Sequence, residues 1–271
     1  MGLTLASTVT IESVGIHSGQ NVTINLVPQS TGGIVFFHQK SKTEIPLTLE
    51  YVHAIYLGTN LNKGDVWIRT IEHLSSVLWA LEITDLRIEL AGDEVPIADG
   101  SGVVYWNQIK EVGVVRTDTV RPVIVLEEPF VQFYDNDIFL MAFPADELSV
   151  NYTINFPNVP VKAQNFVFNG RPSFKNDILN CRTFGNKEDI DKLHSAGKAL
   201  GASLDNCLAY DSNGFVNDPR HENESVRHKI LDLLGDFYAS GYDVQAKIIA
   251  YKTSHAINNQ FLKDLFVKLK L

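Results

Sequence analysis

The segment ESVRHKILDLLGD, residues 224–236, predicts an amphipathic helix with three polar side chains on a single face. His228, Asp232 and Asp236 recur every fourth residue, a spacing that stacks side chains along one side of a helix. An imidazole and a carboxylate one turn apart can bind a single divalent metal ion, and Zn²⁺ accepts such donors at about 2.0–2.2 Å. The same spacing is also typical of a solvated polar stripe on an ordinary amphipathic helix. The choice between the two therefore depends on the rest of the chain.

The first half of the chain predicts a second helix with a histidine near its start. Thr70 is a candidate N-cap, and the apolar side chains after it keep helical spacing at Ile71, Leu74, Leu78 and Leu81. In both halves, the helix leads through a short turn into a strand. This weak repeat predicts an α+β fold of two similar two-layer sandwich domains, each a sheet with helices, with the active site at their interface.

We place the domain boundary in the charged segment 115–122, which contains a proline and has little periodicity. The first domain then covers residues 1–118, with a second helix from about Ser101 to Val112. The second domain covers residues 119–271. Its predicted elements are strands between 123 and 155, helices at about 187–196, 224–239 and 256–270, and strands near Cys207, near Phe215 and at 244–251.

Composition excludes several classes of protein. The chain has 271 residues, 45% of them hydrophobic and 20% charged, which is typical of an ordinary globular protein. Its formal net charge of −9 argues against a protein that binds nucleic acid through general phosphate attraction. We find no apolar run of the roughly 20 residues needed for a transmembrane helix, and no signal peptide. Cys181 and Cys207 form no metal motif or disulfide framework, so we expect free thiols and a cytoplasmic protein.

The Glu72-His73 pair supplies the polar groups that the 224–236 helix lacks. His73, His228 and Asp232 together would give three protein ligands and leave a fourth position for water, as in a catalytic zinc site. Glu72 could then take a proton from that water as it attacks a carbonyl. Alternatively, Glu72 is a first-turn acid that complements the helix dipole, and His73 is a partly buried polar residue.

Three further positions carry candidate chemistry. His255 could act as a general acid or stabilise charge, held by Asp236; alternatively it bonds its own backbone at a helix start. Thr183, in the run RTFG at 182–185, could donate to an oxyanion, or could cap a turn. Lys229 could contact a phosphate or a substrate carbonyl, or be a surface lysine. With Lys229, Arg182 would make the pocket locally basic in an acidic protein.

An ordered set of motifs resembles one family. The motifs are VGIHSG (14–19), TIEHL (70–74), PIADGS (96–101), RTFG (182–185), ESVRHKILDLLGD (224–236) and SHA (254–256). The set is similar to the zinc-dependent UDP-3-O-acyl-N-acetylglucosamine deacetylases of lipid A biosynthesis, and it spans nearly the whole chain. The resemblance implies two α+β sandwich domains with the active site between them. It also implies hydrolysis of the N-acetyl group of a UDP-linked 3-O-acyl amino sugar, with release of acetate.

The resemblance assigns a role to each motif residue. It implies that the zinc ligands are His73, His228 and Asp232. It implies that Glu72 is the general base, that His255 protonates the leaving amine or stabilises charge, and that Asp236 orients His255. Thr183 would stabilise the oxyanion and Lys229 would contact polar groups of the substrate. Arg182 and Phe184 would also contact the substrate.

The resemblance further implies a small insert in the second domain, which shapes a hydrophobic passage for the acyl chain. We expect this insert near residues 151–168, including Phe156, which matches an aromatic position that stacks on uracil. Four departures from the family pattern bear on substrate affinity: Asn155 stands where an acid is usual, Ala202 where a glycine is common, His221 within an altered loop (218–222), and Ile138 near a missing basic residue.

Three functions remain in view. The first is this deacetylase, working with Zn²⁺ or with Fe²⁺, since the ligand set tolerates either; we expect a monomer. The second is a metal-dependent amide hydrolase acting on a different acyl or nucleotide-sugar substrate. The third is a non-catalytic acyl-nucleotide-binding protein. The presence of both Glu72 and His255 argues against the third, because binding alone would not require them.

Overall fold

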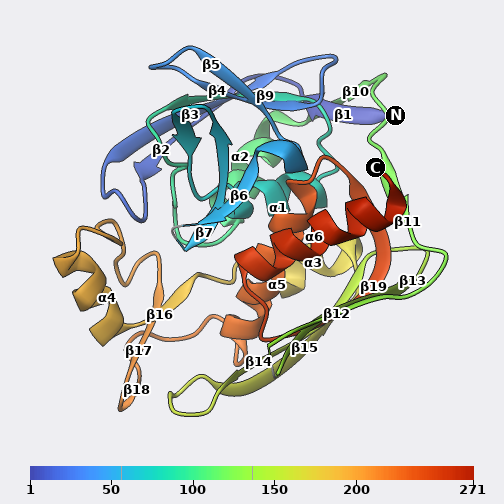
Figure 1. Cartoon of the computed structure of the whole chain (residues 1–271). Helices are drawn as coiled ribbons and strands as arrows, with labels where there is room; N and C mark the ends of the chain where they lie inside the picture. The colour runs from blue at the N-terminus through green and yellow to red at the C-terminus, as the bar shows by residue number, and fades with distance from the viewer. Residues whose placement is uncertain (56, 136) are drawn as a thin grey trace.

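The computed structural model describes residues 1–55, 57–135 and 137–271 and has a mixed α+β fold (Figure 1). The first half contains the following elements: β1 (Gly2–Leu5), β2 (Val9–Val14), β3 (Asn21–Pro28), β4 (Ile34–His38), β5 (Thr43–Pro46), a 3-10 turn η1 (Leu49–Tyr51), β6 (Val52–Ile55), β7 (Gly58–Lys63), β8 (Val66–Ile68), α1 (Glu72–Ala80), β9 (Leu86–Ala91), α2 (Val103–Val112) and β10 (Val114–Thr117).

The second half contains a matching series. Its elements are β11 (Val123–Val125), β12 (Phe130–Tyr134), β13 (Ile138–Pro144), β14 (Ser149–Phe156), β15 (Lys162–Phe168), α3 (Arg171–Asp177), β16 (Phe184–Asn186), α4 (Lys187–Ser195), β17 (Leu208–Asp211), β18 (Gly214–Phe215), α5 (Glu224–Tyr238), β19 (Asp243–Tyr251) and α6 (His255–Leu269).

The two halves have the same sheet topology. The first large sheet has the strand order β2-β3-β9-β4-β5, and the second has the order β12-β13-β19-β14-β15, with β11 added beside β19. In each sheet one step is parallel, β4 with β9 and β14 with β19, and the other steps of the path are antiparallel. The helix before the central strand is α1 in one half and α5 in the other. The duplication predicted from the sequence is therefore confirmed by the order and direction of the strands.

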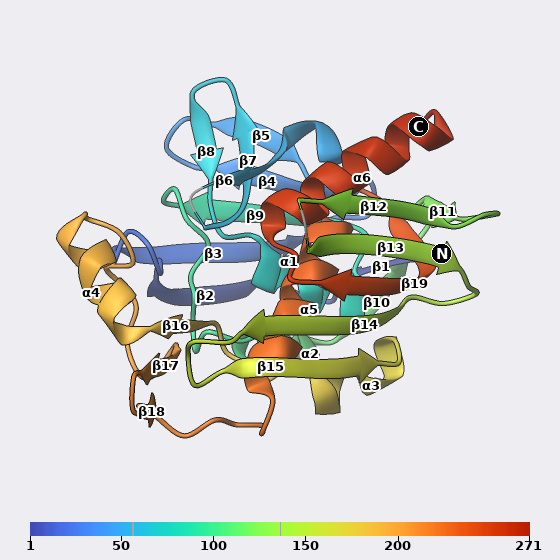
Figure 2. The same cartoon turned by 60° about the horizontal axis from the view of Figure 1, so that its bottom comes forward.

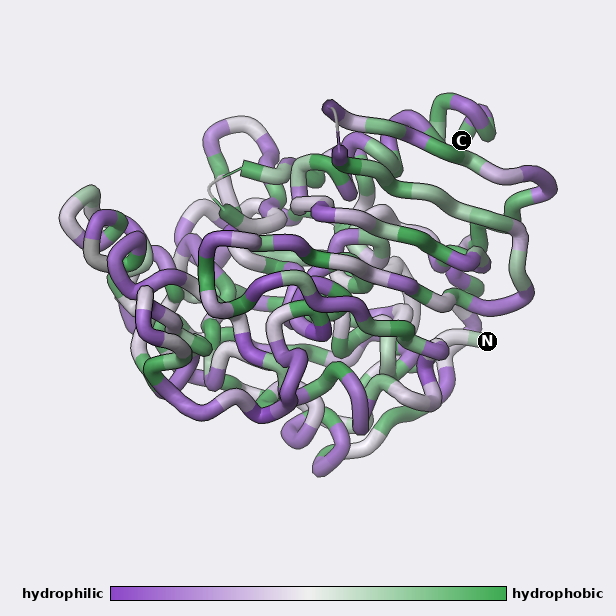
Figure 3. The backbone as a smooth tube through the Cα atoms, turned by 90° about the horizontal axis from the view of Figure 1, so that it is seen from below, coloured by the Kyte–Doolittle hydropathy of each residue, from purple (hydrophilic) through white to green (hydrophobic). Residues whose placement is uncertain are grey.

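Alternating burial along the strands explains which face of each sheet meets the helices. In β3 the buried side chains are Val22, Ile24 and Leu26, and in β19 the same alternation buries Val244, Ala246, Ile248 and Ala250. Figures 1 and 2 show α1, α5 and α6 in the layer between the two large sheets. Figure 3 looks onto the outer face of the second sheet, over whose strands no helix of the described residues is seen.

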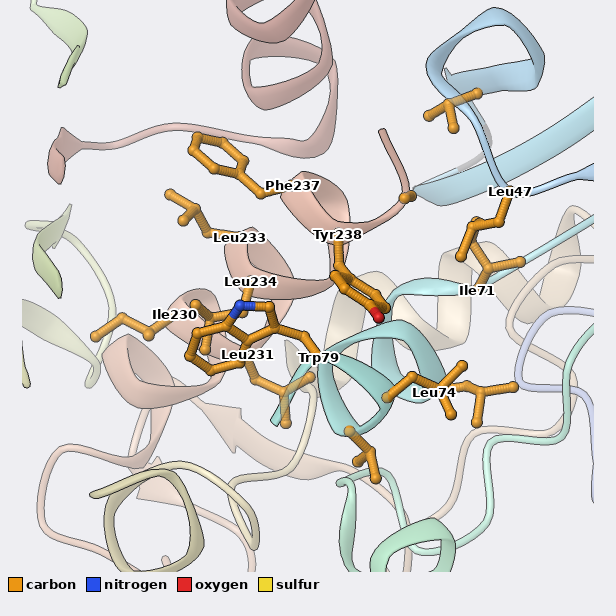
Figure 4. Close-up of a cluster of buried hydrophobic side chains, with 14 of the residues drawn as sticks. Leu47, Ile71, Leu74, Trp79, Ile230, Leu231, Leu233, Leu234, Phe237 and Tyr238 are labelled. Carbon is orange, nitrogen blue, oxygen red and sulfur yellow. The ribbon is translucent and has the colours of Figure 1, made fainter. Parts of the chain in front are cut away.

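Helices α1 and α5 pack against each other at the centre of the molecule. Figure 4 shows their apolar side chains in one cluster, with Leu74 and Trp79 of α1 near Leu231, Leu234 and Tyr238 of α5. All five side chains are almost fully buried. Because burial of apolar surface is the main favourable term in folding, this contact fixes the two halves relative to each other. It also fixes the polar residues at the starts of these helices.

Two expectations about the chain are wrong. Thr70 is not the N-cap of α1: its φ is +57°, its hydroxyl donates to Glu94 at 3.2 Å, and Ile71 holds the cap position. Nor is there an insert at 151–168, because these residues form β14 and β15 of the second large sheet. A separate small sheet, β16-β17-β18 with α4, is formed by later residues. The boundary at residue 118 stays a prediction; β10 ends just before it and pairs back onto β1.

Candidate metal and catalytic site

Three buried side chains from the two halves converge where α1 begins. His73 is the second residue of α1, and His228 and Asp232 lie one turn apart in α5. One potential ligand atom from each lies within 4.8 Å of the others. The Asp232 Oδ1 atom is 3.2 Å from His228 Nε2 and 3.9 Å from His73 Nε2. The duplicated helices thus bring together the three residues that the sequence singled out.

The hydrogen bonds around this cluster fit a bound metal ion. His228 Nδ1 lies 3.0 Å from the Cys181 carbonyl oxygen, which can only accept, so this nitrogen donates, and Nε2, 3.2 Å from Asp232 Oδ1, is the nitrogen placed to coordinate a metal. Among the described residues, neither Asp232 Oδ1 nor His73 Nδ1 has a hydrogen-bond partner, although both atoms are buried. Buried polar atoms without partners are costly, and coordination of a cation would satisfy Asp232 Oδ1.

The protonation states also suit metal binding. Burial, together with the neighbouring His228, lowers the pKa of His73 to about 3, so this imidazole is neutral. For Asp232, burial alone would raise the pKa, but His228 and Lys229 outweigh burial and hold it well below its usual value. The Lys229 ammonium donates to Asp232 Oδ2 at 2.8 Å. A neutral imidazole and an ionised carboxylate are the forms that coordinate divalent metals.

Glu72 and His255 lie beside the cluster and face each other. Glu72 Oε1 is 3.9 Å from His255 Nε2, and Glu72 Oε2 accepts from the Thr59 backbone amide at 3.0 Å. Burial, reinforced by Asp232 and Asp236 and opposed by His255, raises the pKa of Glu72 to about 8. A carboxylate with such a pKa suits proton transfer near neutral pH.

His255 begins α6 and is held by Asp236 from α5. Its Nδ1 atom lies 3.0 Å from both carboxylate oxygens of Asp236. Burial alone would lower the pKa of His255, but Asp236 and Asp232 outweigh it and raise the pKa to about 9. The alternative of a histidine that only bonds its own helix start does not match this geometry. The cap of α6 is the Ser254 hydroxyl, which accepts from Ile257.

A polar cavity of about 560 Å³ opens over the cluster. Its lining includes the charged or titratable Lys229, Asp232 and His255, for which we call it the polar cavity, and also Phe156, Thr183 and Phe184. Phe156 is 40% exposed, and its ring centroid lies 6.1 Å from that of Phe184. The two rings meet edge to face at 74°, so a planar group could stack on the face of the half-exposed Phe156 ring.

A second, mostly apolar cavity of about 240 Å³ lies on the other side of Thr183 and Phe184, which line both. Strand β16, helix α4 and the segment 199–207 supply much of its wall, and Glu72 and His73 also line it. The lining includes Ile16, His17, Ile97, Ile190, Leu193, Ala199, Ala202 and Cys207. The loop at 16–17 is joined to this wall by backbone bonds from Leu200 and Gly201, at 3.2 and 3.0 Å. The residues of the second half that line this mostly apolar cavity therefore lie between Thr183 and Cys207, later in the chain than the expected insert.

Arg182 lines neither cavity, contrary to the expectation of a substrate contact. Its buried guanidinium instead donates to the Glu224 carboxylate at 3.0 Å and to the Asp218 carbonyl oxygen at 2.7 Å. A buried guanidinium needs such partners, and Glu224 sits at the start of α5 to provide one. Arg182 thus anchors the loop that carries Thr183 and Phe184.

The departures from the family pattern have local partners. Asn155 donates to the Tyr251 hydroxyl at 3.2 Å, and His221 Nε2 lies 2.7 Å from Asn180 Oδ1. Ile138 opens β13, and Ala202 lines the apolar cavity. No contact explains by itself why Ile138 is found at its position.

Sequence reasoning missed two residues at the site. Lys252 lines the polar cavity in a left-handed backbone conformation (φ +58°), two residues after the buried Ala250 and three before His255. Its place between a buried strand and the SHA motif could have drawn attention to it. Thr59 bonds to both Glu72 and Asp236, and nothing in its sequence context indicates this.

Comparison with known proteins identifies relatives over nearly the whole chain. The sequence model of the family described as "LpxC: UDP-3-O-acyl N-acetylglycosamine deacetylase" matches residues 3–267. A protein of Leptospira biflexa named UDP-3-O-acyl-N-acetylglucosamine deacetylase is 36% identical over 96% of this chain and 88% of its own length. Proteins with the same name are 36% identical in Synechocystis (98% of each chain) and 38% identical in Thermosynechococcus vestitus (97% of this chain, 93% of the relative). Within the described residues, no helix is long and apolar enough to cross a bilayer.

Proposed function

We infer, because this chain belongs to the UDP-3-O-acyl N-acetylglycosamine deacetylase family, that it removes the N-acetyl group from a UDP-3-O-acyl-N-acetylglucosamine and releases acetate, a step of lipid A biosynthesis. One observation links the proposed reaction to specific residues of the site. Within a chain that matches the family throughout, a buried His-His-Asp cluster lies directly beside a carboxylate whose pKa is raised to about 8.

We propose that His73, His228 and Asp232 hold one divalent metal ion, Zn²⁺ or Fe²⁺. Such an ion, when bound, would polarise the amide carbonyl and make a water molecule acidic enough to lose a proton near neutral pH. Two observations support this assignment: the buried Asp232 Oδ1 has no hydrogen-bond partner within the part of the chain that the structure describes, and His228 turns Nε2 toward it. Lys229 is bonded to the other Asp232 oxygen, so we assign it to holding that ligand and to contacting polar groups of the substrate.

Glu72 is proposed as the general base that takes the proton of the attacking water. Its carboxylate is held on one oxygen by the Thr59 amide, which leaves Oε1 free to face the site. His255 is proposed as the acid that gives a proton to the leaving amine, and Asp236 as the group that orients it. The protonated imidazole that this role needs is available at neutral pH, because the pKa of His255 lies at about 9. Thr183, at the junction of the two cavities, is proposed to donate to the oxygen that becomes negative.

The two cavities suit the two ends of such a substrate. The polar cavity offers the rings of Phe156 and Phe184 for a base and the ammonium of Lys252 for a diphosphate. The apolar cavity bounded by Ile190 and Leu193 offers room for an acyl chain. We therefore propose that the sugar spans the junction at Thr183.

The test is direct: acetate release from the UDP-acyl-sugar is measured alongside bound metal. We expect the wild-type protein to carry about one metal ion per chain and to release acetate. A Glu72→Gln variant keeps the shape of the side chain and all three ligands, so it should bind the metal and lose nearly all activity. Full activity in that variant would show that Glu72 is not the base.

Two broader expectations stay predictions. We propose a cytoplasmic location, which the two buried, free cysteines Cys181 and Cys207 support, since thiols remain reduced there. We also propose that the chain works as a monomer, because both halves of the site are supplied by a single chain.

A further inference from the structure

Thr59 contacts both side chains that transfer protons in the proposed mechanism, Glu72 and His255, although it lines neither cavity. It lies in β7 and is only 1% exposed. Its backbone amide donates to Glu72 Oε2 at 3.0 Å. Its hydroxyl donates to Asp236 Oδ1 at 2.5 Å and lies 3.3 Å from His255 Nδ1. A single residue of the first half is thus bonded to carboxylates on α1 and α5.

The Asp236 carboxylate is held from three directions. Thr59 donates to Oδ1, Asn258 of α6 donates to Oδ2 at 2.8 Å, and His255 Nδ1 lies 3.0 Å from both oxygens. Donors on opposite oxygens fix the plane of a carboxylate, so its rotation is restricted. The plane that remains faces His255 Nδ1, and this bond orients the imidazole with Nε2 toward Glu72.

The consequence is chemical, because proton transfer depends on short distances and on alignment. A general acid must be within hydrogen-bond reach of the atom it serves, and partners outside the first layer of contacts keep it there. Without the Thr59 hydroxyl, Asp236 Oδ1 would lose its closest donor and the carboxylate could turn. The imidazole would then sample orientations in which it cannot reach the leaving group.

We propose that Thr59 is a positioning residue for the reaction, which holds Glu72 through its backbone amide and orients His255 through its hydroxyl. This inference rests on the proposed function. Thr59 contacts no substrate in this arrangement; it acts only through the two proton carriers.

The test uses the full-length, metal-loaded protein and separates positioning from stability. Thr59→Val keeps the shape and the amide but removes the hydroxyl, whereas Thr59→Ser keeps the hydroxyl. Thr117→Val is a matched control, because the buried Thr117 hydroxyl also donates to a buried carboxylate, that of Asp85, at 2.6 Å and far from the site. We expect Thr59→Val to lower kcat by about 10–100-fold with KM and bound metal little changed, and the other two variants to stay near wild type. A kcat for Thr59→Val near that of wild type would overturn the proposal, as would an equal loss in Thr59→Ser.

Two further measurements test whether the Thr59 hydroxyl acts through Asp236 and His255. In an Asp236→Asn background, Thr59→Val should cause little additional loss; a full second loss would mean that the hydroxyl acts by another route. In NMR spectra, the His255 Nδ1–H resonance should broaden and move upfield in Thr59→Val but not in Thr117→Val. If Thr59→Val does not accumulate as folded protein, Thr59→Ala, which also keeps the amide, replaces it in each measurement.

The outcomes distinguish this inference from the proposed function. If wild-type protein and Thr117→Val both release no acetate, the proposed function fails, and the NMR resonance still decides whether Thr59 holds the imidazole. If both release acetate and Thr59→Val matches them, only the positioning role is rejected.

Discussion

Gly235 of α5 meets the backbone of Glu72 where the two central helices cross. A Cβ atom added to Gly235 would lie 2.0 Å from the Glu72 carbonyl oxygen, well inside any possible contact distance. Glycine is therefore required for the close approach of α5 to the start of α1, and this approach sets the separation of the proposed metal ligands on the two helices.

We expect Gly235→Ala to be destabilising and to lose most activity. On helix propensity alone, alanine would stabilise α5 by about 1 kcal/mol, whereas overpacking of this contact should cost about 1–3 kcal/mol or more. The sign of the change in the free energy of unfolding, measured with urea, shows whether helix propensity or overpacking is the larger effect. A variant that is both more stable and fully active would contradict the close packing seen here.

The buried pair of Arg182 and Glu224 predicts a stability that depends on pH. Burial opposes ionisation of Glu224, but hydrogen bonds from Arg182 and from the Arg220 amide outweigh it and lower its pKa below the usual 4.5. Because the pKa in the folded state is the lower one, the stabilisation is present above about pH 4.5 and is lost as the pH falls through the folded-state pKa.

Glu224→Gln should therefore lower the free energy of unfolding by about 3–5 kcal/mol at neutral pH, because it leaves the guanidinium without a charged partner. The difference from wild type should narrow in acid. The exposed Glu128, paired with Lys268, is the control, and Glu128→Gln should change stability little at any pH. A difference between wild type and Glu224→Gln that grows on acidification would refute the assignment.

Ala202 in the wall of the apolar cavity should limit the length of the acyl chain. Ala202→Val adds two methyl groups to that cavity, at a cost of about 0.8 kcal/mol for each methylene of the substrate that no longer fits. We expect kcat/KM for the longest accepted chain to fall by about tenfold, while kcat/KM for shorter chains changes little. Ala163→Val, at an exposed position in β15, is the matched control. An equal loss for all chain lengths would argue against the cavity as the acyl site.

Lys252 is expected to contribute to substrate binding and not to the chemical step. It lines the polar cavity and is paired with the exposed Asp137. Lys252→Ala should raise KM by about tenfold or more with little change in kcat, since a lost phosphate contact weakens binding of substrate and transition state alike. Lys247→Ala, at a solvent-exposed position of β19, the strand that precedes Lys252, should leave both constants unchanged. A drop in kcat at constant KM would instead place Lys252 in the reaction.

Metal removal should affect both activity and stability. A ligand that binds only the folded state stabilises it by mass action, so dialysis against a chelator should lower Tm and abolish acetate release. Restoration by Zn²⁺ or by Fe²⁺, measured separately, would identify the ions that the site accepts. If neither Tm nor activity changes after the metal is removed, the cluster of His73, His228 and Asp232 is not a metal site.

The duplicated architecture and the polar face of α5 could be predicted, because both depend on the local spacing of residues. The four-residue interval between His228, Asp232 and Asp236 survives in any helix, and the strand after each central helix has a clear apolar pattern. The prediction of Thr70 as the N-cap of α1 is wrong, because its hydroxyl donates to Glu94, a contact across the fold that local sequence does not reveal.

Other errors have the same origin in tertiary contacts. The segment 151–168 was expected to be an insert, but its two strands complete the second sheet. Arg182 was expected in the pocket, but the buried Glu224 carboxylate binds its guanidinium. Thr59 has no distinguishing neighbours in sequence, and its partner Asp236 is 177 residues away.

The division of the site between two halves also governs when it can form. His73 is synthesised early, while His228, Asp232 and His255 lie in the last part of the chain, so a growing polypeptide holds only one of the three clustered ligands until α5 has emerged. Contacts between residues so far apart form slowly, because a long loop must close before they contribute. If the cluster holds a metal ion as proposed, all three ligands can reach that ion only after α5 has been synthesised and the two copies of the repeat have docked.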